Sequence, residues 1–257
     1  MILKPLANLD ILLVEDNEMN TLLASAIIKG TGANITEVDN GMDAIQHLKD
    51  RSFDLILMDL YLPVMDGFET VRYIRNQLSN DIPVIAITAN VVNGEEKKCI
   101  EAGMNGFLTK PYTEEGLLEK IAACLAPRKT TEENALSERH FSSTSGLYDL
   151  SFLESVSKGN LDLLRQMIQV FIDQTPRAIQ ELKTAYGKRD FSEMHAIAHR
   201  VKPDIDNLFI LSLREDIRKI ETLALEGKNG VVLENLISNV DKVVKQVVVD
   251  LKSREWA

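Results

Sequence analysis

At the centre of the first half of this chain is the stretch Phe53-Asp-Leu-Ile-Leu-Met-Asp-Leu-Tyr-Leu-Pro-Val-Met-Asp-Gly67. Its apolar residues 55–58 lead directly into Asp59, and Pro63 and Asp66-Gly67 favour a turn after it. A short apolar run that ends at turn residues is typical of a buried strand in a parallel sheet, although the run alone also fits a buried helix. As a strand, it places Asp59 at the carboxyl end, where open α/β sheets bind their ligands.

Apolar runs and amphipathic segments alternate on both sides of this stretch. The predicted strands are residues 10–14, 33–38, 53–59, 83–88 and 106–109, and the predicted helices are residues 18–29, 42–49, 68–77, 94–102 and 114–125. Strands that alternate with helices of this length indicate a doubly wound, five-stranded parallel sheet.

The residues at the carboxyl ends of the predicted strands, or directly after them, are Glu15, Asp16, Asp59, Thr88 and Lys110. Because the carboxyl ends of parallel strands lie at one edge of the sheet, these side chains can converge in one crevice. Crowded carboxylates raise one another's pKa values unless a cation neutralises them, and an all-oxygen ligand set favours a hard ion such as Mg²⁺. A lysine and a hydroxyl beside such a site are what phosphoryl transfer onto a carboxylate requires.

The same residues also allow two other interpretations. Each residue taken singly is compatible with a helix cap or a loop residue, and only the set, with each member at the end of a different strand, argues for a site. A phosphatase with an aspartate nucleophile is the rival on a similar fold, but it would need a second Asp two residues after the first, where this chain has Tyr61.

Four stretches also follow one another in a recognisable order and spacing: Val14-Glu-Asp-Asn17, Met58-Asp-Leu-Tyr-Leu-Pro-Val-Met-Asp-Gly67, Thr88-Ala-Asn90 and Thr109-Lys-Pro111. With them, residues 8–125 resemble a response-regulator receiver domain. The resemblance implies that Asp59 is the phosphoacceptor. It also implies that Asp16 and Asp59 bind Mg²⁺ with the backbone carbonyl of Tyr61, and that Glu15 acts through the water shell of the metal.

The same resemblance assigns the remaining residues of this edge. Lys110 would pair with the acyl phosphate, Thr88 would bond a phosphoryl oxygen, and Phe107 would be the aromatic residue that repacks with Thr88 on activation. The Glu-Asp-Asn form of the acidic pair, with Asn20 three residues on, is common in receivers fused to hybrid sensor kinases. Tyr61 is bulky, which suggests the hypothesis that it slows the attack of water on the phosphate.

Length and composition allow two domains in a soluble globular protein. The chain has 257 residues, of which 45% are hydrophobic and 26% are charged. No apolar run approaches the roughly 18 residues of a membrane helix, and no secretory signal is evident. Cys99 and Cys124 have no metal-binding or redox spacing and fit a reducing compartment. We therefore expect a cytoplasmic protein, or the cytoplasmic part of a larger one, without direct membrane contact.

The net charge of −10 is unevenly distributed. Residues 1–126 contain 10 Lys/Arg and 19 Asp/Glu, a balance of −9, whereas residues 127–257 contain 19 and 20, a balance of −1. The acidic first half excludes a nucleic-acid surface there and suits a cation site. We predict a receiver domain over residues 8–126, a polar linker over 127–147 and a second domain over 148–257.

The second half has helical periodicity throughout. Predicted helices cover residues 151–157, 161–186, 191–208, 212–225 and 231–254, and the short loops between the long ones indicate an all-α antiparallel bundle. Pro176 predicts a kink or break near Thr175.

One helix of this bundle contains the candidate chemistry, in Ala196-Ile-Ala-His-Arg-Val-Lys202. The apolar residues of this helix recur at three- and four-residue spacing and are predicted to face the core: Met194, Ile197, Ala198, Val201, Ile205 and Leu208. At 100° per residue, His199 lies about 200° round from Ile197 and points away from that core, and Lys202 is its neighbour on the surface, three residues on. An exposed imidazole beside an ammonium can accept a phosphoryl group, although an exposed helical His is usually only solvated. A zinc site at His195 and His199 lacks the Glu of HExxH and an evident third ligand.

With Ala198-His-Arg-Val-Lys202 and Asn207-Leu208, residues 148–254 resemble a histidine phosphotransfer domain. The resemblance implies that His199 is the phosphohistidine and Lys202 its supporting cation. Two residues depart from the family, which usually has Gly where this chain has Pro203 and Phe209. Pro203 cannot donate to the carbonyl of His199, so we predict a local kink there.

The two resemblances together indicate a two-component phosphorelay. The expected partners are a histidine kinase core, which phosphorylates Asp59 in the presence of Mg²⁺, and a downstream response regulator, which receives the group from His199. No ATP-binding kinase domain is evident, so we expect a carboxy-terminal portion of a hybrid sensor kinase or a free-standing protein of that layout. The alternative is a phosphorylation-switched interaction module whose bundle only docks partners.

Overall fold

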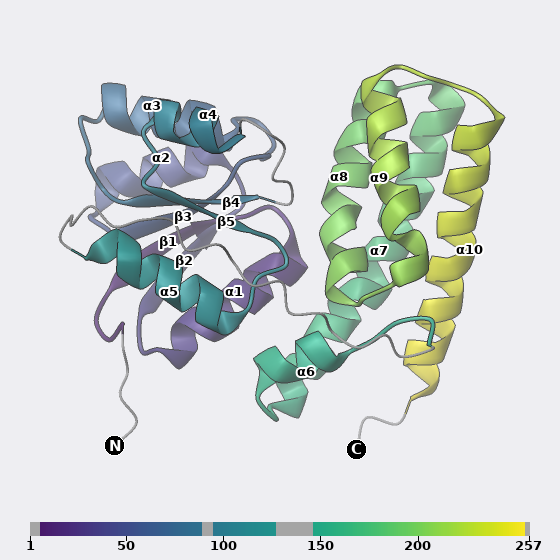
Figure 1. The fold of residues 1–257 in the computed structure, drawn as a ribbon, viewed down its shortest axis with the longest axis horizontal. Coiled ribbons are helices and arrows are strands. Elements are labelled where there is room, and N and C mark those ends of the chain that lie inside the picture. Colours follow the sequence, from purple (N-terminus) through teal and green to yellow (C-terminus); the bar gives the residue numbers. More distant parts are fainter. Residues whose placement is uncertain (1–5, 89–94, 127–145, 255–257) are drawn as a thin grey trace. The chain divides into compact units, whose positions relative to one another are not determined.

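The computed structural model describes residues 6–88, 95–126 and 146–254, and these form two compact units (Figure 1). The unit that contains the strands ends at Gly146. The unit that begins at Leu147 has helices as its regular secondary structure, and it also includes residues Asn17–Ile27.

The first unit is built on a five-stranded parallel sheet, as the sequence predicts. Its strands are β1 (Asp10–Val14), β2 (Asn34–Val38), β3 (Leu55–Asp59), β4 (Val84–Thr88) and β5 (Gly106–Thr109), in the order β2-β1-β3-β4-β5. The helices that alternate with these strands along the chain are α1 (Glu18–Gly30), most of which belongs to the second unit, α2 (Gly41–Asp50), α3 (Gly67–Asn76), α4 (Glu95–Ala102) and α5 (Glu114–Leu125). Residue 94, the predicted start of α4, lies outside the described residues.

The apolar strands explain the layers. Strands β3 and β4 are buried along their whole length, because helices cover both faces of the sheet. Helices α2, α3 and α4 lie over one face and α5 lies over the other (Figure 1). The core on the first of these faces includes Leu12, Ile56, Val71 and Val84. Side-chain caps begin the helices: Asp66, for example, accepts from the backbone N–H of Glu69 at 2.7 Å at the start of α3.

The second unit is the predicted helical bundle. Its helices are α6 (Ser151–Ser157), α7 (Leu161–Lys188), α8 (Phe191–Asn207), α9 (Leu211–Leu225) and α10 (Val231–Ser253). Helix α7 packs against α8 and α10, and α9 packs against the same two helices, so the four long helices enclose one core. The short α6 packs on α7. Within the described ranges, no helix is both long enough and apolar enough to cross a membrane.

The two prolines do not interrupt their helices. Helix α7 is continuous from Leu161 to Lys188, so the predicted break near Pro176 is wrong. A break is avoided because neighbouring helices hold the flanking turn: the buried Thr175 donates from its hydroxyl to Asp204 of α8 at 2.9 Å. Helix α8 likewise continues across Pro203 to Asn207.

Candidate functional site

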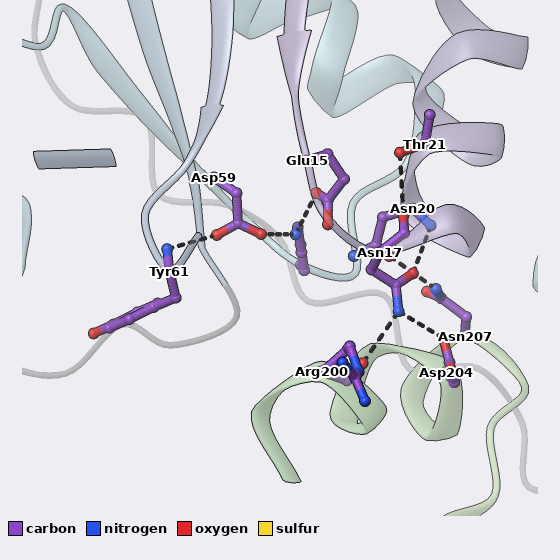
Figure 2. Close-up of polar contacts among 10 residues, drawn as sticks. Glu15, Asn17, Asn20, Thr21, Asp59, Tyr61, Arg200, Asp204 and Asn207 are labelled. Atoms are coloured by element: carbon purple, nitrogen blue, oxygen red, sulfur yellow. Dashed lines mark hydrogen bonds and ion pairs between the residues drawn. The ribbon is translucent and has the colours of Figure 1, made fainter. Parts of the chain in front are cut away.

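The predicted strand ends meet around the ammonium of Lys110. Its Nζ atom lies 2.5 Å from Oε2 of Glu15 and 2.6 Å from Oδ2 of Asp59 (Figure 2). The three side chains are 8% exposed or less. Parallel register produces the meeting, because Val14 pairs with Met58 and so places Glu15, which follows β1, beside Asp59, the last residue of β3. Ion pairs this close in a buried site are charge-assisted hydrogen bonds.

Asp16 completes a group of three carboxylates at this edge. Glu15, Asp16 and Asp59 each offer one oxygen, and the three oxygens lie within 4.8 Å of one another. The other oxygen of Asp59 accepts the backbone N–H of Tyr61 at 3.1 Å (Figure 2). Converging carboxylate oxygens with no thiol or imidazole among them fit a hard divalent cation. In the part of the chain that is described, this is the one such group of three or more His, Cys, Asp or Glu residues.

The carboxylates of the site stabilise the charged form of Lys110. Burial alone lowers the pKa of Lys110, but the carboxylates of Asp59 and Glu15 outweigh burial and raise that pKa above its ordinary value. Lys110 is therefore a permanent cation between the two acids. Burial also raises the pKa of the neighbouring Tyr112 hydroxyl, which stays neutral.

Gly67 allows the turn after β3 to lie directly against the backbone of Asp59, the candidate phosphoacceptor. A Cβ atom at this position would lie 2.2 Å from the carbonyl oxygen of Asp59 and 2.9 Å from Cα of Leu60. The N–H of Gly67 donates to the carbonyl of Leu60 at 3.0 Å. Glycine is required here because the backbone of α3 approaches the end of β3 too closely for any side chain.

The same turn contains a strained residue. Val64 has φ 67°, in the left-handed region that β-branched residues avoid, and it is 85% exposed. The N–H of Met65 donates to the carbonyl of Pro63 at 2.7 Å, so the chain closes a three-residue turn around Val64.

Thr88 and Phe107 lie on the neighbouring strands. Thr88 is buried at the end of β4 and pairs in register with Thr109, and its carbonyl accepts the N–H of Lys110 at 2.7 Å. Phe107 lies inside β5, opposite Ala86, and its partly buried ring packs against the core. Ala89 and Asn90 of the Thr88-Ala-Asn90 stretch lie outside the described residues.

The helical unit contains a second cluster, around Glu221 of α9. Nδ1 of His199 lies 2.5 Å from Oε1 of Glu221, and Nζ of Lys202 lies 2.9 Å from each carboxylate oxygen. The prediction of Lys202 on the surface beside an exposed His199 is wrong. Lys202 is fully buried and the His199 side chain is only 19% exposed. The reason is that α8 packs against α7 and also against α9, so the face turned away from one neighbour is covered by the other.

Glu221 defines the state of the imidazole. Partial burial raises its pKa, but the hydrogen bond with His199 and the charge of Lys202 outweigh burial and lower the pKa to about 2. An ionised carboxylate can only accept, so the proton of this hydrogen bond lies on Nδ1 of His199. Sequence reasoning missed Glu221. The available signal was weak: an acidic residue directly after Ile220 and four residues after Ile217, at the edge of an apolar stripe.

The zinc alternative at His195 and His199 is not supported by the geometry. The two rings stack with their centroids 6.3 Å apart, and the pair does not belong to the metal-competent group described above. Burial lowers the pKa of His195 despite the nearby Glu221 carboxylate.

Phe209, one of the two departures from the family pattern, has φ 48°. This left-handed conformation ends α8 and is the reason a glycine suits the position. The ring compensates through contacts with Phe152, at 6.2 Å between centroids, and with the guanidinium of Arg214, at 4.9 Å.

Comparison with known proteins identifies the sheet-containing part. Residues 11–122 match the family described as "Response regulator receiver domain". The N-terminal part of the chain is a response regulator receiver domain. It is homologous to the receiver domains of hybrid sensor kinases.

Two curated relatives extend beyond the receiver domain. The chain is 27% identical over 219 residues to "Sensor histidine kinase GacS" of Pseudomonas protegens, covering 83% of this chain and 24% of that protein. It is 26% identical over 244 residues to "Sensor protein GacS" of Pseudomonas syringae pv. syringae, covering 91% and 26%. The chain thus spans about a quarter of the length of these relatives.

Among solved structures, the receiver domain of sensor histidine kinase PA1611 from Pseudomonas aeruginosa, which holds a magnesium ion in its active-site cleft, is 36% identical. It covers 47% of this chain and 100% of its own, with a TM-score of 0.44.

Proposed function

We propose that this chain relays phosphoryl groups in a two-component pathway. Asp59 of the receiver domain accepts the group from a kinase phosphohistidine, and His199 passes it on to the receiver of a downstream response regulator. The transfer from Asp59 to His199 is direct or passes through another receiver. The observation that carries the proposal is the buried ammonium of Lys110, held 2.5 Å from Glu15 and 2.6 Å from Asp59 beside a third carboxylate.

The first transfer forms one bond and breaks one. An oxygen of Asp59 attacks phosphorus, the P–N bond of the donor phosphohistidine breaks, and its electron pair returns to the donor imidazole. The Lys110 ammonium moves from a carboxylate to the phosphoryl oxygens, which it neutralises. Thr88 is our candidate donor of a hydrogen bond to a phosphoryl oxygen, and Phe107 is the candidate aromatic switch.

The carboxylates of Glu15, Asp16 and Asp59 fit Mg²⁺, with the backbone carbonyl of Tyr61 as a further ligand. Bound there, the ion would supply positive charge to the phosphoryl oxygens. Among the described residues, Lys110 is the cation paired with acids of this group, and an incoming phosphoryl group would add further negative charge beside them. We therefore propose that phosphorylation of Asp59 requires Mg²⁺.

His199 is suited to the second transfer by its partners. Nε2 attacks the phosphorus of an aspartyl phosphate and the P–O bond to the carboxylate breaks, which restores the aspartate. Glu221 keeps the proton on Nδ1 and stabilises the positive charge that develops on the ring, in the way an acidic residue orients a catalytic imidazole. Lys202 neutralises Glu221 from the buried side of the helix.

The relatives support the setting. Both proteins named GacS are described as sensors, and the similarity to them runs through both units of this chain. We propose that residues 8–126 form the receiver domain, 127–147 a linker and 148–257 a histidine phosphotransfer domain, acting in the cytoplasm with a kinase core and a response regulator as partners. The competing proposal is a docking module without transfer, favoured by Pro203 and by the left-handed Phe209.

The test of the receiver half uses the full chain with a small phosphoryl donor, such as acetyl phosphate. We expect Mg²⁺-dependent, base-labile label that disappears in Asp59→Asn. Asp66→Asn is the matched control, because it removes a carboxylate from the same turn while Asn still caps α3. Equal labelling of Asp59→Asn and the unaltered chain would overturn the assignment.

A further inference from the structure

Charged side chains form a seam between α8 and α9. On α8, His199, Lys202 and Asp206 lie three and four residues apart and therefore share one face. On α9, Arg214, Arg218 and Glu221 share a face by the same spacing. The helices run side by side and are joined by a turn of three residues, Leu208 to Ile210 (Figure 1). Glu221 contacts His199 and Lys202. Arg214 and Arg218 contact Asp206.

The end of the seam nearest the turn is a buried carboxylate with two guanidinium partners. Asp206 is 7% exposed. Its Oδ1 atom lies 3.1 Å from Nε of Arg214, and its Oδ2 atom lies 2.7 Å from Nη2 of Arg218. Arg218 also donates to the backbone carbonyl of Arg214 at 2.9 Å, which fixes the guanidinium along α9.

The signs of the charges alternate along the seam. Helix α8 presents a cation at Lys202 and an anion at Asp206, whereas α9 presents an anion at Glu221 and a cation at Arg218. If α9 slid by one turn, about 5.4 Å, in one direction Glu221 would approach Asp206, and in the other Arg218 would approach Lys202. Both shifts bring like charges together, and Lys202 and Asp206 of α8 are buried. Buried polar pairs of this kind specify register.

We infer that Asp206, held by Arg214 and Arg218, is a positioning residue for His199. It keeps α9 in register with α8, and the register keeps Glu221 at Nδ1 of the imidazole. The inference rests on the proposed function for the role of His199 as a phosphoacceptor. The geometry of the imidazole can be measured without any phosphoryl donor.

The experiment uses ¹⁵N-labelled full chain and reads the protonation of the two His199 ring nitrogens by NMR, followed by the rate of phosphoryl transfer to His199. In Asp206→Asn we expect a mixture of Nδ1-H and Nε2-H forms and a fall in rate of roughly tenfold, the usual scale for a partner that acts through a second residue. Asp206→Glu keeps the carboxylate, and it should therefore retain most of the Nδ1-H form and most of the transfer rate. Arg218→Gln, which leaves Arg214 in place, is the milder variant should Asp206→Asn not fold.

The matched control is Asp241→Asn. Asp241 of α10 accepts from Lys183 of α7 at 3.0 Å and from Lys245 at 2.8 Å, so the variant loses an interhelical ion pair of the same bundle away from His199. The inference is overturned if the His199 signals and transfer rate of Asp206→Asn and Arg218→Gln equal those of Asp241→Asn. If the ring nitrogens change as expected while the unaltered chain accepts no phosphate at His199, the seam stands and the relay proposal fails.

Discussion

Replacing Glu221 by Gln should remove a pH-dependent part of the stability of the helical unit. The pKa of Glu221 falls from 4.5 to about 2 in the folded protein, where His199 and Lys202 bond its charged form. At about 1.4 kcal/mol per pH unit, the difference corresponds to roughly 3 kcal/mol. Since the folded pKa lies below the unfolded one, this stability is present above pH 4.5 and is lost as the pH falls toward about 2.

The assay is urea unfolding of the full chain at several pH values between 2 and 6, followed through resolved NMR signals of α8 and α9. Near pH 6, Glu221→Gln should lower the free energy of unfolding by about 3 kcal/mol, because Lys202 is then buried without its carboxylate. Near pH 2 the two proteins should converge, since protonated Glu and Gln are similar in shape and charge. Acids elsewhere titrate equally in both proteins, so the difference reports on the cluster that Glu221 forms with His199 and Lys202.

Glu215→Gln is the control, since Glu215 is exposed on the same helix. It removes the same charge and should change stability by less than about 0.5 kcal/mol. A Glu221→Gln deficit that stays constant from pH 6 to pH 2 would refute the reasoning, because the lost stability would then come from packing and not from the ionised carboxylate.

Four further changes test the receiver turn and the end of α8. Val64→Gly should stabilise the receiver domain by about 1 kcal/mol in urea unfolding, because it relieves a left-handed conformation at an exposed residue. Gly67→Ala should destabilise it by about 2 kcal/mol or more, through the 2.2 Å clash with the Asp59 carbonyl. Tyr61→Asn should shorten the aspartyl-phosphate lifetime measured by label decay, and an unchanged lifetime would remove the hypothesis. Phe209→Gly should destabilise the bundle despite the released strain, since the ring contacts with Phe152 and Arg214 are lost; a rise in stability would contradict this.

The receiver half could be predicted in detail because its information is local. Each strand is a short apolar run, and each candidate residue ends its strand or follows it directly, so parallel pairing brings Glu15, Asp59 and Lys110 to one edge. The sequence could not show that the ammonium of Lys110 pairs with both Glu15 and Asp59 at once, because that depends on the side-chain positions. It also gave no sign that Val64 is strained, because backbone angles depend on how the turn closes.

The helical half was harder because its site depends on which helices pack together. Periodicity located the apolar stripe of α8 correctly, yet it assigned Lys202 to the surface, since a single helix does not reveal its second neighbour. Glu221 is 22 residues from His199 in sequence and becomes its partner only through the pairing of α8 with α9. Helix α7 likewise stays continuous across Pro176 because of contacts with another helix, such as the hydrogen bond from Thr175 to Asp204.

The relay itself is tested most directly by following phosphate onto His199. The full chain is phosphorylated in the presence of Mg²⁺ by a phosphorylated kinase core or acetyl phosphate, and the label is sorted by its stability to acid and base. The account predicts acid-labile, base-stable label that is absent from His199→Gln and also from Asp59→Asn. Label confined to Asp59, with His199 inert toward every receiver tested, would contradict it and leave the bundle as a docking module.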